Sequence, residues 1–318
     1  MDRSRLIDTL STIAAIPVTP LSATGEVDWP AYQRVIRRLV DGGITVITPN
    51  GNTGEFYALT VEECDRAVAV TMEVVEASGG RALVMPGVGH DVATAVALGR
   101  TAARYGAEAV MVHQPVHPYQ SAEGWVAYHA AIAEALPDLG VVPYVRDPQV
   151  TPAMLGHLAR QPNVVGVKYA VPHPLQFAAT VAAVGAERLA WICGLAEGWA
   201  PFFWPGGAVG FTSGLVNVET SSPFEMLEAL RRGDYAGAMA VWRKVKPFED
   251  LRARRNAANN VPVVKEALAQ LGICGRAVRP PISEVPEAER AEVASLLSAL
   301  GLGSPTPPVP SFARGGRE

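Results

Sequence analysis

The chain alternates between short apolar runs and longer amphipathic stretches from residue 12 to residue 212. Short runs rich in Val, Ile and Ala are typical of strands buried on both faces, whereas an apolar residue every three or four positions is typical of a helix covering a sheet. This pattern predicts eight strands separated by helices. We expect the strands at residues 12–16, 45–49, 82–87, 109–114, 141–145, 164–170, 189–194 and 208–212.

Several of the expected helices carry their own boundary signals. Thr60 and Glu63 have the spacing of a capping box, in which each side chain bonds the backbone of the other residue. Thr151 followed by Pro152 predicts an N-cap with proline in the first turn. Gly106 follows an amphipathic stretch and predicts a helix C-terminus.

Eight strands alternating with helices favour an α/β fold of the (β/α)8 barrel type. A doubly wound sheet is the alternative, but it usually has fewer strands and often a glycine-rich fingerprint after the first strand, where this chain has I-P-V-T-P. We expect the barrel with a short N-terminal extension at 1–222, additional C-terminal helices packed on it at 223–302, and a flexible tail at 303–318.

One lysine stands inside an apolar strand. The segment N-V-V-G-V-K-Y-A-V places Lys168 where an ammonium group is costly to bury. Lowering a lysine pKa from about 10.4 to about 7–8 costs roughly 3–5 kcal/mol, and the resulting neutral amine is a nucleophile towards carbonyls. The alternative is a structural ion pair with Glu55 or Asp147.

Composition narrows the function classes. A net charge of −4 with 18% charged residues offers no basic surface for nucleic acid or for an anionic membrane. Three dispersed cysteines suit neither a disulfide framework nor a zinc site. No stretch is apolar for long enough to span a bilayer, and the first residues do not resemble a secretory signal, so we expect a cytoplasmic location.

Polar residues at the C-terminal ends of barrel strands are the first candidates for chemistry. Tyr144 and Arg146 end the fifth predicted strand on one face, where a phenol can relay protons and a guanidinium can bind a carboxylate. The alternative, a rim tyrosine beside an Arg146–Asp147 ion pair, is equally open.

The turn around Asn52 and Thr53 can point N–H groups at an anion, although an ordinary βα turn fits its spacing as well. After the eighth strand, Thr212 and Ser213 can bind substrate oxygens or cap the next helix.

Histidines and arginines complete the list of candidates. His113 and His117 follow the fourth predicted strand, and His90 follows the third. Pro115 and Pro118 predict a loop around the first two, so a solvated or substrate-facing role is favoured over a metal site. The segment R-A-R-R at 252–255 lies in a helical pattern and is interpreted as a solvated helix face.

Taken in order, these motifs resemble one family. G-N-T-G-E at 51–55, the tyrosine ending the fifth strand, and G-V-K-Y at 166–169 are similar to the pattern of the dihydrodipicolinate synthase / N-acetylneuraminate lyase family. The opening I-P-V-T-P-L, Gly194 and G-F-T-S-G-L-V-N-V fit this pattern too, and the resemblance covers roughly residues 10–300.

The resemblance implies a class I Schiff-base mechanism on a (β/α)8 barrel, without a cofactor or metal, and usually in a homotetramer. Lys168 is then expected to attack the ketone of a 2-oxo acid and Tyr144 to shuttle protons. Asn52, Thr53, Gly54 and the nearby backbone N–H groups hold the substrate carboxylate, and the further contacts expected are Arg146, Gly194, Thr212 and Ser213.

Departures from the synthase pattern bear on the substrate. Asn52 replaces a second threonine, Gln149 replaces an arginine, and His117 stands where the synthase has a tyrosine that reaches the neighbouring subunit. Y-V-R-D and the pair Thr212-Ser213 resemble the 5-dehydro-4-deoxyglucarate dehydratase branch, in which Arg146 receives a distal carboxylate, although that branch typically has Gly at Asn52 and Asp at Tyr169.

We therefore expect a lyase acting on a 2-keto sugar acid by dehydration or retro-aldol cleavage. The alternatives are a 4-hydroxy-tetrahydrodipicolinate synthase that condenses pyruvate with an aldehyde, a barrel that binds a metabolite without converting it, and a metal-dependent aldolase.

Overall fold

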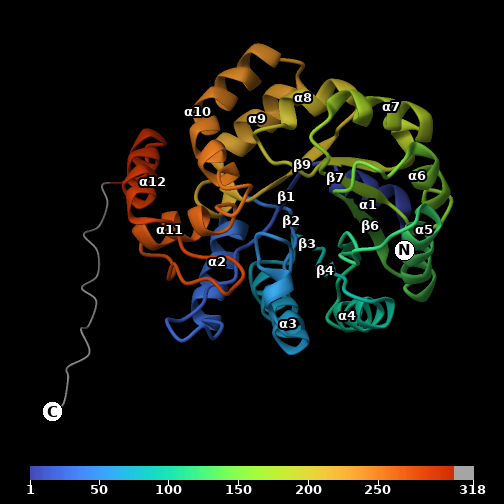
Figure 1. The fold of residues 1–318 in the computed structure, drawn as a ribbon, viewed down its shortest axis with the longest axis horizontal. Coiled ribbons are helices and arrows are strands. Elements are labelled where there is room, and N and C mark those ends of the chain that lie inside the picture. The colour runs from blue at the N-terminus through green and yellow to red at the C-terminus, as the bar shows by residue number, and fades with distance from the viewer. Residues whose placement is uncertain (304–318) are drawn as a thin grey trace.

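The computed structural model describes residues 1–303 and confirms the predicted (β/α)8 barrel (Figure 1). The predicted tail lies, from residue 304 onwards, outside the described residues. Neighbouring strands pair in parallel throughout the sheet. The strands are β1 (Ile13–Ala15), β2 (Val46–Ile47), β3 (Leu83–Val84), β4 (Gly87–Val88), β5 (Ala109–Val112), β6 (Gly140–Val145), β7 (Gly166–Tyr169), β8 (Ala190–Cys193) and β9 (Gly210–Ser213).

The third predicted strand is divided into β3 and β4 by Met85 and Pro86. Because β3 pairs with β2 while β4 pairs with β5, this one stretch of chain closes the ring. Backbone hydrogen bonds continue across the division: Gly87 donates to the carbonyl of Pro49 at 2.8 Å, and Met111 donates to that of Pro86 at 2.9 Å. The barrel therefore has eight strands in nine segments.

Helices surround this ring and extend beyond it (Figure 1). The division predicted between residues 222 and 223 falls in the first turn of α9, and three further helices follow. The helices are α1 (Arg3–Leu10), α2 (Trp29–Asp41), α3 (Val61–Ala77), α4 (Val92–Arg104), α5 (Ala122–Ala135), α6 (Pro152–Leu158), α7 (Pro174–Val184), α8 (Ala200–Phe203), α9 (Ser221–Arg231), α10 (Tyr235–Ala253), α11 (Pro262–Gln270) and α12 (Glu287–Ala299). Within residues 1–303 no helix combines the length and apolarity needed to cross a membrane.

The predicted helix boundaries are confirmed. Thr60 and Glu63 form a capping box at the start of α3. Thr151 accepts a hydrogen bond from the backbone of the first turn of α6, where Pro152 is the first residue. Gly106 follows α4 with φ 97°, in the left-handed region that glycine adopts without strain.

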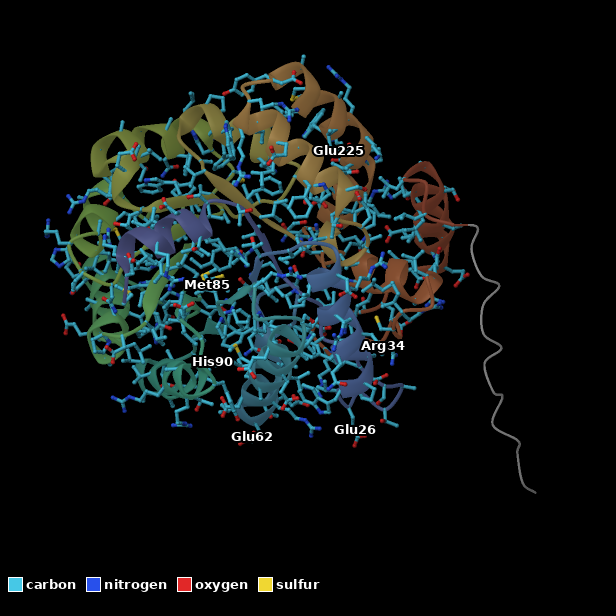
Figure 2. All side chains as sticks on the ribbon, turned by 180° about the vertical axis from the view of Figure 1, so that it is seen from behind. Glu26, Arg34, Glu62, Met85, His90 and Glu225 are labelled. Atoms are coloured by element: carbon cyan, nitrogen blue, oxygen red, sulfur yellow. The ribbon has the colours of Figure 1, made fainter. Side chains whose placement is uncertain are left out.

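Two apolar layers explain why the strands are buried on both faces. Val141 and Val145 of β6 belong to the layer between strands and helices, whereas Val142 belongs to the layer inside the ring. This alternation follows from the two-residue period of a strand. Figure 2 shows the buried Met85, a member of the inner layer, and the exposed Glu62 at the edge of the molecule.

Candidate active site

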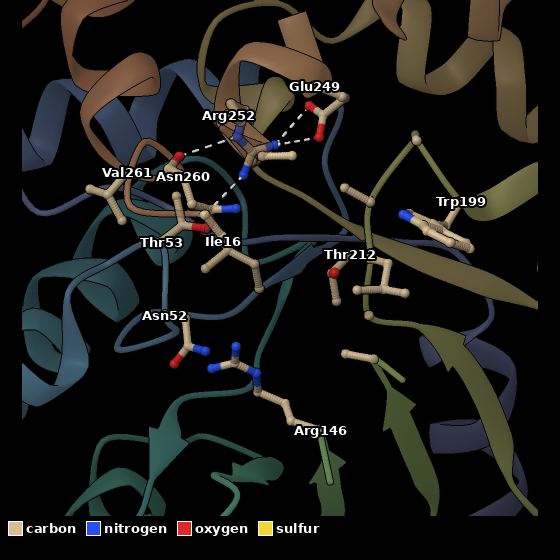
Figure 3. Close-up of a pocket in the computed structure, with 18 of the residues that line it drawn as sticks. Ile16, Asn52, Thr53, Arg146, Trp199, Thr212, Glu249, Arg252, Asn260 and Val261 are labelled. Carbon is tan, nitrogen blue, oxygen red and sulfur yellow. Dashed lines mark hydrogen bonds and ion pairs between the residues drawn. The ribbon is translucent and has the colours of Figure 1, made fainter. Parts of the chain in front are cut away.

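A cavity of about 820 Å³ extends from the C-terminal ends of the barrel strands to α10 and the segment after it (Figure 3). This is the end of the barrel at which the sequence predicts the chemistry. Seven of the ten predicted site residues line the cavity: Asn52, Thr53, Tyr144, Arg146, Lys168, Gly194 and Thr212.

Lys168 points into the barrel because its neighbours in β7 point out. Val167 and Tyr169 both belong to the layer between strands and helices. Lys168 is only 4% exposed, and within residues 1–303 its amine makes no ion pair, so the structure does not contain the alternative pair with Glu55 or Asp147. Burial, followed by the positive charge of Arg146, lowers the pKa of Lys168 to about 7.

Tyr144 lies directly beside Lys168. The two residues are Cα partners in the parallel pairing of β6 with β7, and Nζ of Lys168 lies 4.0 Å from the centroid of the Tyr144 ring. The Tyr144 hydroxyl accepts a hydrogen bond from Nδ2 of Asn52 at 3.3 Å. Burial raises the pKa of Tyr144, which keeps the phenol protonated and able to donate.

The turn that follows β2 is tightly hydrogen-bonded but leaves two donors available. Gly54 donates its N–H to the carbonyl of Gly51, and Glu55 donates to that of Asn52, both at 3.0 Å. The N–H groups of Asn52 and Thr53 have no acceptor in the described part of the chain. Since both residues line the cavity, the turn can present these N–H groups to an anion.

Arg146 lines the cavity on its exposed side. Its side chain is exposed, and no ion pair with Asp147 or any other carboxylate forms within residues 1–303. Thr212, at the end of β9, lines the same cavity and is 5% exposed. The guanidinium of Arg146 and the hydroxyl of Thr212 can therefore both contact a ligand bound at Lys168.

Three predicted site residues do not line the cavity. The Ser213 hydroxyl accepts the N–H of Val216 at 3.1 Å, which matches the capping alternative. The Gly54 carbonyl accepts the Thr19 hydroxyl at 2.8 Å, so this glycine serves the fold of the turn. His117 is exposed, and its Nδ1 contacts the backbone of the same loop.

His113 corrects the expectation of a solvated or substrate-facing loop residue. It is 1% exposed, its Nε2 lies 2.8 Å from the carbonyl oxygen of Asn50, and its ring stacks on Phe56 at 4.2 Å. Burial lowers the pKa of His113 to about 3, so the ring is neutral. Within residues 1–303 no group of three or more His, Cys, Asp or Glu side chains is placed to hold a metal ion.

Arg252 is the exception to the interpretation of R-A-R-R as a solvated face, since residues 253–255 are exposed as expected. It is 3% exposed and lines the cavity, where Nη1 contacts both Glu249 oxygens at 2.7 and 2.9 Å and Nη2 contacts Oδ1 of Asn260 at 3.2 Å (Figure 3). Only the i, i+3 spacing of Glu249 and Arg252 indicated this pair in the sequence. Nearby, burial and the charge of Glu249 raise the pKa of Glu197 to about 8.

Within residues 1–303 the buried amine of Lys168 has no carboxylate partner and lies beside a phenol at the mouth of a (β/α)8 barrel, an arrangement typical of lyases that work through a lysine Schiff base. The profile of the Dihydrodipicolinate synthetase family matches residues 9–300, and the chain belongs to this family.

Named relatives represent two branches of the family. The chain is 30% identical over 292 residues to a 4-hydroxy-tetrahydrodipicolinate synthase of Acidiphilium cryptum, covering 90% of this chain and 96% of that protein. It is 31% identical over 295 residues to a probable 5-dehydro-4-deoxyglucarate dehydratase of Saccharopolyspora erythraea, covering 91% and 94%. A crystal structure of dihydrodipicolinate synthase from Bacillus clausii superposes with a TM-score of 0.90 at 45% identity, covering 93% of this chain and all of that one.

Proposed function

We propose that this protein is a Schiff-base lyase acting on a 2-oxo acid, with Lys168 as the nucleophile. The observation that carries the proposal is the Lys168 amine, which is buried at the cavity, has no ion-pair partner in the described part of the chain, and lies 4.0 Å from the Tyr144 ring centroid. Because burial lowers its pKa to about 7, the amine is partly neutral at neutral pH and able to attack a carbonyl.

In the proposed reaction the Lys168 amine adds to the C2 carbonyl of the substrate. The carbinolamine loses water, and Tyr144 supplies and recovers the protons of this step. The resulting iminium withdraws electrons from the adjacent carbons. It therefore assists one of two reactions. In dehydration, C3 loses a proton and C4 loses its hydroxyl as water, which leaves a C3=C4 double bond; in cleavage, the C3–C4 bond breaks, the aldehyde leaves and C3 regains a proton. Water then hydrolyses the imine, which releases the product and frees Lys168.

We infer that the substrate is a small 2-keto sugar acid. The N–H groups of Asn52 and Thr53 receive its C1 carboxylate, and the exposed guanidinium of Arg146 receives a distal carboxylate. The name of the Saccharopolyspora erythraea relative supports this dehydratase branch. The name of the Acidiphilium cryptum relative supports the second candidate, a synthase condensing pyruvate with an aldehyde.

The assembly and location are further proposals. We infer a homo-oligomer in the cytoplasm, with residues near His117 facing a second subunit. Sedimentation or light scattering of the purified protein measures the oligomeric state directly.

The test is product analysis with 5-dehydro-4-deoxyglucarate as substrate. Dehydration predicts loss of substrate without pyruvate, whereas retro-aldol cleavage predicts pyruvate released in step with substrate loss. The Lys168→Ala variant is expected to do neither. Turnover that survives in this variant would contradict the imine mechanism, and pyruvate consumption with an aldehyde by the wild type would favour the synthase.

A further inference from the structure

A buried ion pair joins the C-terminal helices to the active-site turn. Lys265 of α11 is 0% exposed, and its Nζ forms an ion pair with Oε1 of Glu55 and donates to the carbonyl of Ala277 at 2.8 Å. The other Glu55 oxygen accepts the backbone N–H of Arg279 at 3.2 Å. Glu55 is the last residue of G-N-T-G-E, so two groups from the C-terminal region hold this motif.

The backbone of Glu55 adopts an unfavourable conformation that must be stabilised by its contacts. Its φ of 62° and ψ of 33° lie in the left-handed region, which is unfavourable for a residue with a side chain because its Cβ approaches the backbone too closely. Strain of this kind persists only where the surroundings impose it. The guanidinium of Arg279 adds to the hold by binding Glu63 at 2.6 Å and the carbonyl of Ala58 at 2.8 Å.

The turn that contains Glu55 contacts the proposed catalytic residue Tyr144. Glu55 donates its N–H to the carbonyl of Asn52 at 3.0 Å, and the Asn52 amide donates to the Tyr144 hydroxyl at 3.3 Å. A chain of contacts therefore runs from Lys265 through the turn to Tyr144, whose ring lies against Lys168.

The charge of Lys265 matters as much as its position. Glu55 lines the cavity, next to the N–H groups that face the substrate carboxylate in the proposed function. Two like charges in a partly buried cavity repel strongly, because water screens them poorly. The ammonium of Lys265 neutralises Glu55 from the side away from the substrate.

We propose that Lys265 is a positioning residue of the active site, which holds the Asn52–Thr53 turn through Glu55 and cancels the Glu55 charge that opposes an anionic substrate. This inference rests on the proposed function, because it assumes that a 2-oxo acid binds at Lys168.

The test measures borohydride trapping on Lys168 as a function of pyruvate concentration, by intact-protein mass. Lys265→Met is expected to raise the half-saturating pyruvate concentration about tenfold or more, corresponding to about 1.4 kcal/mol, with a smaller effect on the maximal trapping rate. The double variant Glu55→Gln/Lys265→Met removes both charges and is expected to recover much of the affinity.

Glu266→Gln is the matched control. Glu266 is the next residue of α11, is 1% exposed, and pairs with Arg276 at 3.1 Å, but it does not line the cavity. Its replacement perturbs the same helix and is expected to leave the half-saturating concentration at the wild-type value.

Three outcomes would overturn the positioning role while leaving the proposed function intact. These are wild-type pyruvate affinity in Lys265→Met, equal weakening in the double variant, and equal weakening in Glu266→Gln. If the double variant does not fold, Glu55→Gln alone replaces it and is expected to bind pyruvate better than Lys265→Met. A wild-type protein that traps no pyruvate would instead overturn the proposed function.

Discussion

Two lysines of this protein are both buried, but they lie in opposite electrostatic surroundings. Lys168 in β7 is 4% exposed and Lys265 in α11 is 0% exposed, and burial lowers the pKa of both. Lys265 pairs with Glu55, whereas Lys168 has no carboxylate partner within residues 1–303 and faces a phenol.

The difference shows that a carboxylate partner, rather than burial, distinguishes a structural lysine from a reactive one. An opposite charge at contact distance favours the ammonium form, while a nearby Arg146 and an apolar strand favour the neutral amine. A neutral amine is nucleophilic, and a paired ammonium is not.

Replacing Tyr144 with Phe is expected to have the largest effect. The ring that packs on Lys168 is kept, but the proton relay is lost, so turnover is expected to fall about 10²–10⁴-fold. Steady-state kinetics measure this loss. Tyr32→Phe is the matched control, because the Tyr32 hydroxyl bonds Thr71 in the core, away from the cavity; an equal loss there would contradict a specific role for Tyr144.

Replacing Lys265 with Met is expected to destabilise the fold. Removing one partner of a buried ion pair leaves Glu55 uncompensated and typically costs about 3–5 kcal/mol. Denaturant unfolding measures the loss of free energy of unfolding. A variant as stable as the wild type would show that this buried ion pair contributes no more to the free energy of unfolding than an exposed ion pair does.

Replacing Lys168 with Met is expected to stabilise the fold. The unfolded chain holds this proton up to about pH 10.4, whereas the fold lowers the pKa to about 7, so the cost of burial is fully present below pH 7 and fades as the pH rises towards 10. We expect a gain on the order of 4 kcal/mol at pH 7. A less stable Lys168→Met variant would contradict the assignment of Lys168 as the unpaired lysine.

The smallest expected effect is on the pH dependence. The trapping rate of the wild type should rise with pH, with a midpoint near the Lys168 pKa of about 7, because only the neutral amine attacks. Arg146→Met removes a positive charge that lowers this pKa, so the midpoint should move to higher pH. Arg146 is exposed, so we expect a shift on the order of a few tenths of a unit. Arg146→Lys keeps the charge and should keep the midpoint; a shift to lower pH in Arg146→Met would contradict the account.

Local patterns explain how much the sequence could predict. Apolar strand runs, the Thr60–Glu63 capping box and the lysine in G-V-K-Y depend on neighbouring residues, so the barrel, its helix boundaries and a lysine buried in a strand followed from them. Whether Lys168 has a carboxylate partner stayed open. The segment V-P-V-V-K-E-A-L at 261–268 also places a lysine in an apolar run, but no local pattern predicted that Lys265 pairs with Glu55. Its carboxylate comes from the other end of the chain, and no periodicity reveals such a contact.

Arg252 and His113 show the same limit. Arg252 lies on a helix whose buried face depends on how α10 meets the barrel mouth. His113 directly follows β5, and its stacking on Phe56 depends on the path of the turn after β2. Sequence patterns predict elements, whereas burial of a polar residue depends on packing between distant elements.

The most direct test of the central claim is borohydride reduction in the presence of pyruvate and, separately, of 5-dehydro-4-deoxyglucarate, followed by intact-protein mass and peptide mapping. An unpaired Lys168 predicts a single adduct on that residue, and none on Lys265. Unmodified protein with both compounds, or adducts confined to other lysines, would contradict the account.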